Sequence, residues 1–370
     1  MSSGPVPPTG GDVALRCTDS GARRAYTLPM SPPLGTRARA RVAAVCAIGL
    51  LGSALSAAGP ATSTAAGTEG FLFADVLARG DADSTGEPCE SVGGSFSETE
   101  PLTADGTSVS VLNSAEVTLT SPTDPSDSAD FVVRGKGTGA VKQSAGAVRS
   151  FWFLGDVSTT STSTKGAAGD CDYQALSRAA TSFTGQYRRG FLRLTVDSPG
   201  GLFYLATMRG PTGDVLLGNN PAGLLTYDVH LDPGEHRVDL QVEAVVRRPE
   251  GAGSPTRAVG TVEFVGTYAR LGGSLGKATG NGRSTVKLPG ARSCSAATLT
   301  TKLKRKARRA RQVVVQVDGK RPVTVKRPQK GKKVVVRRLP ATQAVTARAI
   351  ITRKSGKVLT TSRDYVACRE

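Results

Sequence analysis

The chain of 370 residues has few of the side chains on which most enzymes depend. It contains two histidines, one tryptophan and six cysteines, and aromatic residues make up only 5% of it. The segment 272–276 matches the sequence motif of a nucleophile elbow, but no histidine follows it in the chain. Because that motif needs a preceding strand, a following helix and a later histidine, we exclude a serine hydrolase of this kind.

Both histidines fall in the segment 226–242, where apolar and polar residues alternate on either side of 232–235. The proline and glycine of 232–235 suit a type II turn, so the pattern predicts a β-hairpin. In that hairpin His230 points outward and His236 lies partly buried beside the turn. We interpret both as strand residues. The alternative is a metal site that joins them to nearby carboxylates: Asp228, Asp232 or Glu235.

Other candidate sites are weaker. Two acidic clusters resemble parts of a calcium loop: Asp81, Asp83 and Thr85, then Asp124, Asp127 and Asp130. In the first cluster the twelfth position is Val92, which cannot supply the bidentate carboxylate that such a loop needs. We expect polar loops at both places, with no metal, no cofactor and no catalytic residue assigned. Paired carboxylates for glycoside hydrolysis stay open, because their separation is a property of the fold.

No apolar period of 3.6 residues persists, whereas short alternating runs and 44 glycines favour strands and turns. The sequence therefore predicts an all-β protein whose body, at 70–270, is one β-sandwich or jelly-roll-like domain. Two smaller domains divided near Tyr187 are the alternative. The segment 172–180 is the one modest helix candidate.

The N-terminal part has the pattern of an export signal. An arginine-rich stretch at 36–41 precedes an uncharged run at 42–58, after which small residues take over. This is typical of a secretory signal peptide, which we place at 30–61, followed by a flexible leader at 62–69. Residues 1–29 are interpreted as an extension that results from a wrongly assigned translation start, or as a disordered segment. We expect an extracellular or cell-wall-associated protein; the alternative is a membrane anchor through 42–58, at the lower edge of bilayer-spanning length.

Signal cleavage would leave four cysteines: Cys89, Cys171, Cys294 and Cys368. An even number in an oxidising compartment indicates two disulfides, for which three connectivities are possible. We favour Cys89–Cys171 and Cys294–Cys368, because each pair then lies within one predicted domain.

The C-terminal part is strongly basic. Residues 291–370 carry 23 lysines and arginines against three acids, whereas 61–290 carry 19 basic and 25 acidic residues. A glycine-rich stretch at 271–293 is expected to be the linker between the two. Seven cations gather at 302–311: Lys302, Lys304, Arg305, Lys306, Arg308, Arg309 and Arg311. They form a candidate contact for an anionic polymer; the alternative is a solvated basic face. No aromatic residue is interleaved, so base stacking is not indicated.

Alternating valines and Asp318-Gly319, a hairpin signal, predict a small immunoglobulin-like sandwich at 294–370. This segment resembles a C-terminal module of secreted actinobacterial proteins. The matching residues are Cys294, Val313, Val315, Val317, Gly319, Lys320, Leu339, Pro340, Val345, Gly356, Lys357, Arg363, Tyr365 and Cys368. The resemblance covers about a fifth of the chain and implies export and a β-sandwich, without a defined activity.

These observations favour a secreted or envelope-associated, non-catalytic binding or structural protein. Its basic C-terminal part would contact an anionic cell-wall polymer or a membrane surface, and no specific nucleic acid. The alternative is an extracellular carbohydrate-active hydrolase that uses Asp and Glu carboxylates.

Overall fold

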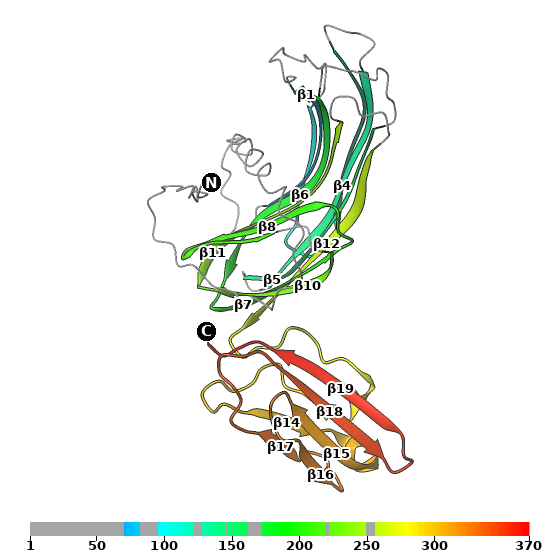
Figure 1. The fold of residues 1–370 in the computed structure, drawn as a ribbon. Helices are drawn as coiled ribbons and strands as arrows, with labels where there is room; N and C mark the ends of the chain where they lie inside the picture. The colour runs from blue at the N-terminus through cyan, green and yellow to red at the C-terminus, as the bar shows by residue number, and fades with distance from the viewer. Residues whose placement is uncertain are drawn as a thin grey trace, which may run out of the picture. The chain divides into compact units, whose positions relative to one another are not determined.

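The computed structural model describes residues 70–81, 95–121, 128–144, 147–161, 172–218, 222–248 and 256–369. The predicted signal peptide and leader, and the predicted pair Cys89–Cys171, lie outside this part. The described chain consists almost entirely of antiparallel strands, with two short 3-10 helices (Figure 1), so the all-β class is confirmed. Within it, no helix has the length and apolar character needed to cross a membrane. The run 42–58 is outside the range of that finding.

The described body consists of two six-stranded sheets. The first contains, in order, β2 (Ser95–Pro101), β1 (Gly70–Asp81), β6 (Asp172–Tyr187), β11 (Gly234–Arg248), β8 (Phe203–Gly210) and β9 (Gly213–Gly218). The second contains β10 (Gly223–Leu231), β7 (Gly190–Ser198), β12 (Arg257–Arg270), β5 (Ala147–Ser161), β4 (Ser128–Ser144) and β3 (Val109–Thr120).

The pairing of the last eight body strands is nested. β8 pairs with β9, β7 with β10, β6 with β11 and β5 with β12. A chain folded back on itself in this way and wrapped into two sheets is a jelly roll. β1 and β2 extend the first sheet beyond β6, and β3 and β4 extend the second beyond β5. Each sheet thus contains strands from both sides of Tyr187, so the alternative of two smaller domains is wrong.

The predicted hairpin at 226–242 is also wrong, although both of its strands exist. β10 ends at Leu231 and β11 begins at Gly234, but the two strands belong to different sheets. The short link at 232–233 therefore crosses from one layer to the other. Alternation defines which residues of a strand face the core, and it does not say which strand lies alongside.

The helix candidate at 172–180 is part of the long strand β6. Every second side chain from Tyr173 to Ala179 is buried, which is the period of a strand. β6 lies between β1 and β11 and pairs with both over most of its length. This pairing on two sides overrides the helix propensity of the residues Gln174 to Leu176.

Aromatic rings fill the space between the two sheets. Phe153 stacks on Phe264, and Tyr204 meets the same ring edge to face at 6.0 Å between centroids. Phe151 meets Phe183 edge to face at 5.0 Å. Gly266 faces the Phe151 ring so closely that a Cβ atom there would lie 2.2 Å from it. The body is thus a filled sandwich held by large, interlocking side chains.

The C-terminal module, residues 272–369, is a second and smaller sandwich. One sheet contains β13 (Val286–Lys287), β14 (Leu299–Leu303) and β17 (Lys333–Val336). The other contains β16 (Val323–Lys326), β15 (Ala310–Val317), β18 (Val345–Arg353) and β19 (Val358–Tyr365). The 3-10 helices are η1 (Asn281–Ser284) and η2 (Arg305–Arg309). Seven described strands in two such sheets give an immunoglobulin-like arrangement.

The stretch at 271–293 differs from the expected linker, because most of it is built into the module. Ser274 and Thr279 form bridges with Tyr365 and Ser362 on β19. Glycines make the required turns: Gly272 and Gly280 have φ of 66° and 88°, which favour glycine. Val286 and Leu288 then enter the module's core.

Two further contacts close the module. Cys294, between β13 and β14, is disulfide-bonded to Cys368 after β19, which agrees with the favoured pairing. Arg292 is buried, and its guanidinium donates hydrogen bonds to three carbonyl oxygens, of Pro340, Gln343 and Val366, at 2.7–2.9 Å. Burial lowers the pKa of this arginine.

Candidate functional site

The seven cations predicted to contact an anionic polymer lie at the junction of β14, η2 and β15. All seven are exposed. Between them, Leu303, Ala307 and Ala310 are buried in the module's core. These three buried apolar side chains hold the backbone in place, and every basic side chain between them stays on the outside.

A row of three lysines crosses the sheet that contains β14. Lys302 is the register partner of Lys287 on β13 and of Lys333 on β17. Side chains directly opposite on neighbouring strands lie about 5 Å apart at Cβ, and like charges there destabilise a sheet. Repulsion within the row therefore lowers the stability of the module, and a bound external anion would reduce that repulsion.

Backbone contacts bring four more cations to the same end of the module. Lys354 donates its N–H to the carbonyl of Arg309 at 3.1 Å, and Arg327 donates to that of Arg311 at 3.2 Å. Arg353 is the register partner of Ala310, and Lys326 that of Gln312. We define the basic end as this set: Lys287, Lys302, Lys304, Arg305, Lys306, Arg308, Arg309, Arg311, Lys326, Arg327, Lys333, Arg353 and Lys354.

Sequence reasoning found only the contiguous part of the basic end. Lys287, Lys333, Arg327 and Lys354 are scattered through the sequence, and only strand register and loop contacts gather them. No linear pattern marks Lys287, which lies in the stretch expected to be a linker. Alternating valines around Lys333 indicated a strand, without indicating its partner.

The acids of the module lie at its other end. Asp318 follows the end of β15, whereas η2 precedes its start, so β15 separates them by about 25 Å. Asp318 accepts a hydrogen bond from the Thr346 N–H, and Asp364 accepts one from the Thr346 hydroxyl. Every ion pair found in the described residues is in the body. The basic end thus carries charge that its own module does not neutralise.

The two histidines of the body occupy structural positions. His236 is only 4% exposed, and its Nε2 is 2.9 Å from the Asp232 carbonyl oxygen. Its ring packs edge to face on Tyr187. His230 packs on Phe191 in the other sheet. In the residues with described positions, no group of three potential metal ligands is found.

Of the acidic clusters, most members lie outside the described residues, and Asp130 accepts a hydrogen bond from Thr118 on the neighbouring strand.

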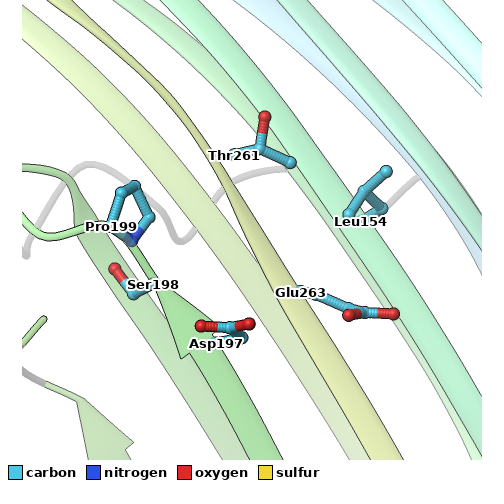
Figure 2. Close-up of a pocket in the computed structure, with 6 residues that line it drawn as sticks. All are labelled: Leu154, Asp197, Ser198, Pro199, Thr261 and Glu263. Carbon is cyan, nitrogen blue, oxygen red and sulfur yellow. The ribbon is translucent and has the colours of Figure 1, made fainter. Parts of the chain in front are cut away.

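A shallow groove of about 360 Å³ lies on the outer face of the second body sheet (Figure 2). Its lining residues are Leu154, Asp197, Ser198, Pro199, Thr261 and Glu263. Asp197 on β7 and Glu263 on β12 are register partners, and both are exposed. Sequence reasoning did not single out this pair. Strand alternation predicts that each points outward, but their juxtaposition depends on the β7–β12 pairing.

Comparison with known proteins gives no assignment. No protein-family model and no curated protein matches the chain. Among solved structures, a GH31 alpha-xylosidase from Xanthomonas citri is 10% identical, with a TM-score of 0.14, over 51% of this chain and 29% of that one. Infectious bursal disease virus, Gx strain, is 13% identical, with a TM-score of 0.14, over 82% of this chain and 66% of that one. The chain spans less than two thirds of either, and neither similarity carries an argument.

Proposed function

We propose that the chain is an exported, non-catalytic binding protein whose C-terminal module attaches to an anionic cell-wall polymer through the basic end. The observation that supports this best is the one-sided charge of the module. Thirteen of its cations gather at the basic end without ion pairs among the described residues, and Asp318 and Asp364 lie at the other end. A polymer of phosphate or carboxylate groups would release its counterions on binding such a surface.

The binding test uses the full chain without residues 1–61 and fluorescently labelled polyphosphate, followed by anisotropy. We expect binding that weakens steeply as salt rises, because each phosphate neutralised contributes to the salt slope. Replacing the lysine row (Lys287→Gln, Lys302→Gln, Lys333→Gln) should lower that slope by roughly 2–3 and weaken binding at least about tenfold near physiological salt.

A matched triple variant at the opposite end of the module controls for net charge. Lys320→Gln, Arg321→Gln and Arg337→Gln remove the same three charges far from the lysine row. These changes should weaken binding only about two- to threefold, through long-range electrostatics. Equal losses in the two triple variants, or binding that does not respond to salt, would contradict a defined basic end.

Export and wall attachment need a test in cells. We expect the protein in the wall fraction, released by salt, with a mature N-terminus near residue 59 or 62. The lysine-row variant should shift from the wall to the medium. A protein that stays in the membrane fraction, with residues 42–58 intact, would support the anchor instead.

A carbohydrate-active hydrolase is the second candidate function, and Asp197 and Glu263 are the pair that would serve it. Glycoside hydrolysis needs one carboxyl group that keeps its proton at neutral pH, which enzymes achieve by burying it. Both groups here are open to water on a shallow face, and the interior of the sandwich is filled. The groove therefore favours binding over hydrolysis. New reducing ends formed from wall polysaccharide, and lost in Glu263→Gln, would favour the enzyme.

A further inference from the structure

The outer face of the second body sheet carries a feature that polyanion binding does not use. Across neighbouring strands, Asp197, Glu263 and Leu154 occupy one register row. Thr195, Val265 and Trp152 occupy the next row on the same face. Figure 2 shows Asp197 and Glu263 in the floor of the groove, with Pro199 and Leu154 at its two sides.

Among the described residues, the two carboxylates have no ion-pair partner. Side chains directly opposite on adjacent strands are close, and like charges there are unfavourable by up to about 1 kcal/mol. Further along the same face, Asp228 meets Arg193 in a two-fold hydrogen-bonded pair at 2.7 Å. Asp197 and Glu263 make no such ion pair with any described residue. Both side chains are exposed, so no described residue occupies their acceptor atoms, which a bound ligand's donors can reach.

The rest of the groove is apolar or hydroxylated. Leu154 and Pro199 form its walls, and Ser198 and Thr261 add hydroxyl groups. Val265 is 37% exposed, and Trp152 beside it is half-buried, so the next row offers an apolar shelf. A small number of strong acceptors between apolar surfaces is the usual composition of a small-ligand site, and the volume falls in the range of roughly 300–1,000 Å³.

We propose that this groove binds a neutral oligosaccharide. Sugar hydroxyls donate short, charge-assisted hydrogen bonds to carboxylates, which are about twice as strong as neutral ones. The C–H faces of the sugar rings would lie on Leu154, Pro199 and the shelf of Val265 and Trp152. A divalent cation fits less well, because no third acidic or imidazole ligand joins the pair among the described residues. A simple amine would pair with the two carboxylates but would make no apolar contact with the walls of the groove.

Trp152 makes the test specific, because it is the only tryptophan in the chain. The full chain without residues 1–61 is titrated with neutral hexasaccharides built from glucose, xylose, mannose or arabinose, and tryptophan emission is followed. We expect at least one of them to shift the emission with a submillimolar dissociation constant. No shift with any of them at about 5 mM would overturn the proposal.

The variant Asp197→Asn with Glu263→Gln should weaken sugar binding at least about tenfold, because it removes both charged acceptors. Glu98→Gln with Glu100→Gln, two exposed positions on β2 of the other sheet, is the matched control and should bind normally. Equal weakening in both variants overturns the proposal, as does binding of spermine in place of every sugar. Melting curves identify a variant that has not folded, and Glu263→Gln alone then replaces the double variant.

This proposal stands apart from the one for the basic end. The lysine-row variant should bind the sugar normally, and the Asp197/Glu263 variant should bind polyphosphate normally. Loss of both activities in either variant would show that the two surfaces had not been separated, and would overturn the assignment of the sugar to the groove.

Discussion

The two sandwiches of this chain are stabilised by different means. The body packs large aromatic rings between two six-stranded sheets, and its outer faces pair Arg178 with Asp75 and Arg193 with Asp228. The core of the C-terminal module is made mainly of valine, leucine and alanine, and is closed by the Cys294–Cys368 disulfide. The described residues of the module contain no comparable ion pair.

This difference explains how so much like charge is tolerated. A small domain with a small core gains little from burial, and self-repulsion among exposed cations lowers its stability further. A covalent link between Cys294 and Cys368 offsets that cost without neutralising any charge. The body has a larger core, and some of its charges form pairs on its own surface, as Arg178 does with Asp75 and Arg193 with Asp228. We infer that the module's charge serves an external partner, whereas the paired charges of the body serve the fold.

The largest expected effect comes from removing the disulfide. In Cys294→Ser with Cys368→Ser, the module should lose roughly 4 kcal/mol of unfolding free energy, because the bond closes a loop of 74 residues. Calorimetry of the full chain without residues 1–61 should then show one transition moved well below the other.

Trp152 lies in the body, so tryptophan fluorescence reports the body alone and controls for this experiment. The fluorescence transition should stay within about 0.5 kcal/mol of the unmodified chain. An equal loss of unfolding free energy by fluorescence and by calorimetry would mean that the two sandwiches unfold as one unit. That result would contradict the separate stabilisation of body and module.

A smaller effect is expected at the glycine that lets the body sheets approach. Gly266→Ala would place a Cβ atom 2.2 Å from the Phe151 ring, which Phe183 holds from another side. Overpacking of this kind costs about 1–3 kcal/mol, and urea denaturation followed by Trp152 fluorescence should show it. Val259→Ala, an exposed position on the same strand β12, is the control and should change the stability of the body by no more than about 0.5 kcal/mol.

Combining Gly266→Ala with Phe151→Leu should recover part of the loss, since the smaller side chain leaves room for the new methyl group. A double variant less stable than the sum of the two single changes would show that the ring contact is not the cause.

The sequence predicted which residues form strands, but it did not predict which strands pair with each other. Alternation located both strands at 226–242, yet the turn-like 232–235 suggested a hairpin where the chain in fact changes sheet. At 172–180 the local composition favoured a helix, and pairing on two sides made it a strand. The same limit applies to the candidate sites. The run at 302–311 is contiguous and was found, whereas the lysine row and the Asp197/Glu263 pair exist only through long-range register.

The smallest expected effect concerns two buried tyrosines, one in each sandwich. In the module, the Tyr365 hydroxyl donates a hydrogen bond to the Pro289 carbonyl at 2.9 Å. In the body, the Tyr204 hydroxyl is buried and has no hydrogen-bond partner among the residues that the structure describes. At pH 7, Tyr365→Phe should therefore cost about 1 kcal/mol, whereas Tyr204→Phe should be neutral or slightly stabilising. Calorimetry that resolves both transitions measures the two changes.

Alkaline pH sharpens this contrast for Tyr204. Burial raises the pKa of Tyr204 to about 12, whereas a tyrosine in the unfolded chain ionises near pH 10. The native state then keeps a proton that the unfolded state releases, so this tyrosine's contribution is complete below about pH 10 and is lost as the pH rises toward 12. Tyr204→Phe removes that loss, so its stability relative to the unmodified body should increase between pH 7 and pH 11. An unchanged difference between the two proteins at both pH values would show that Tyr204 is hydrated in the folded body.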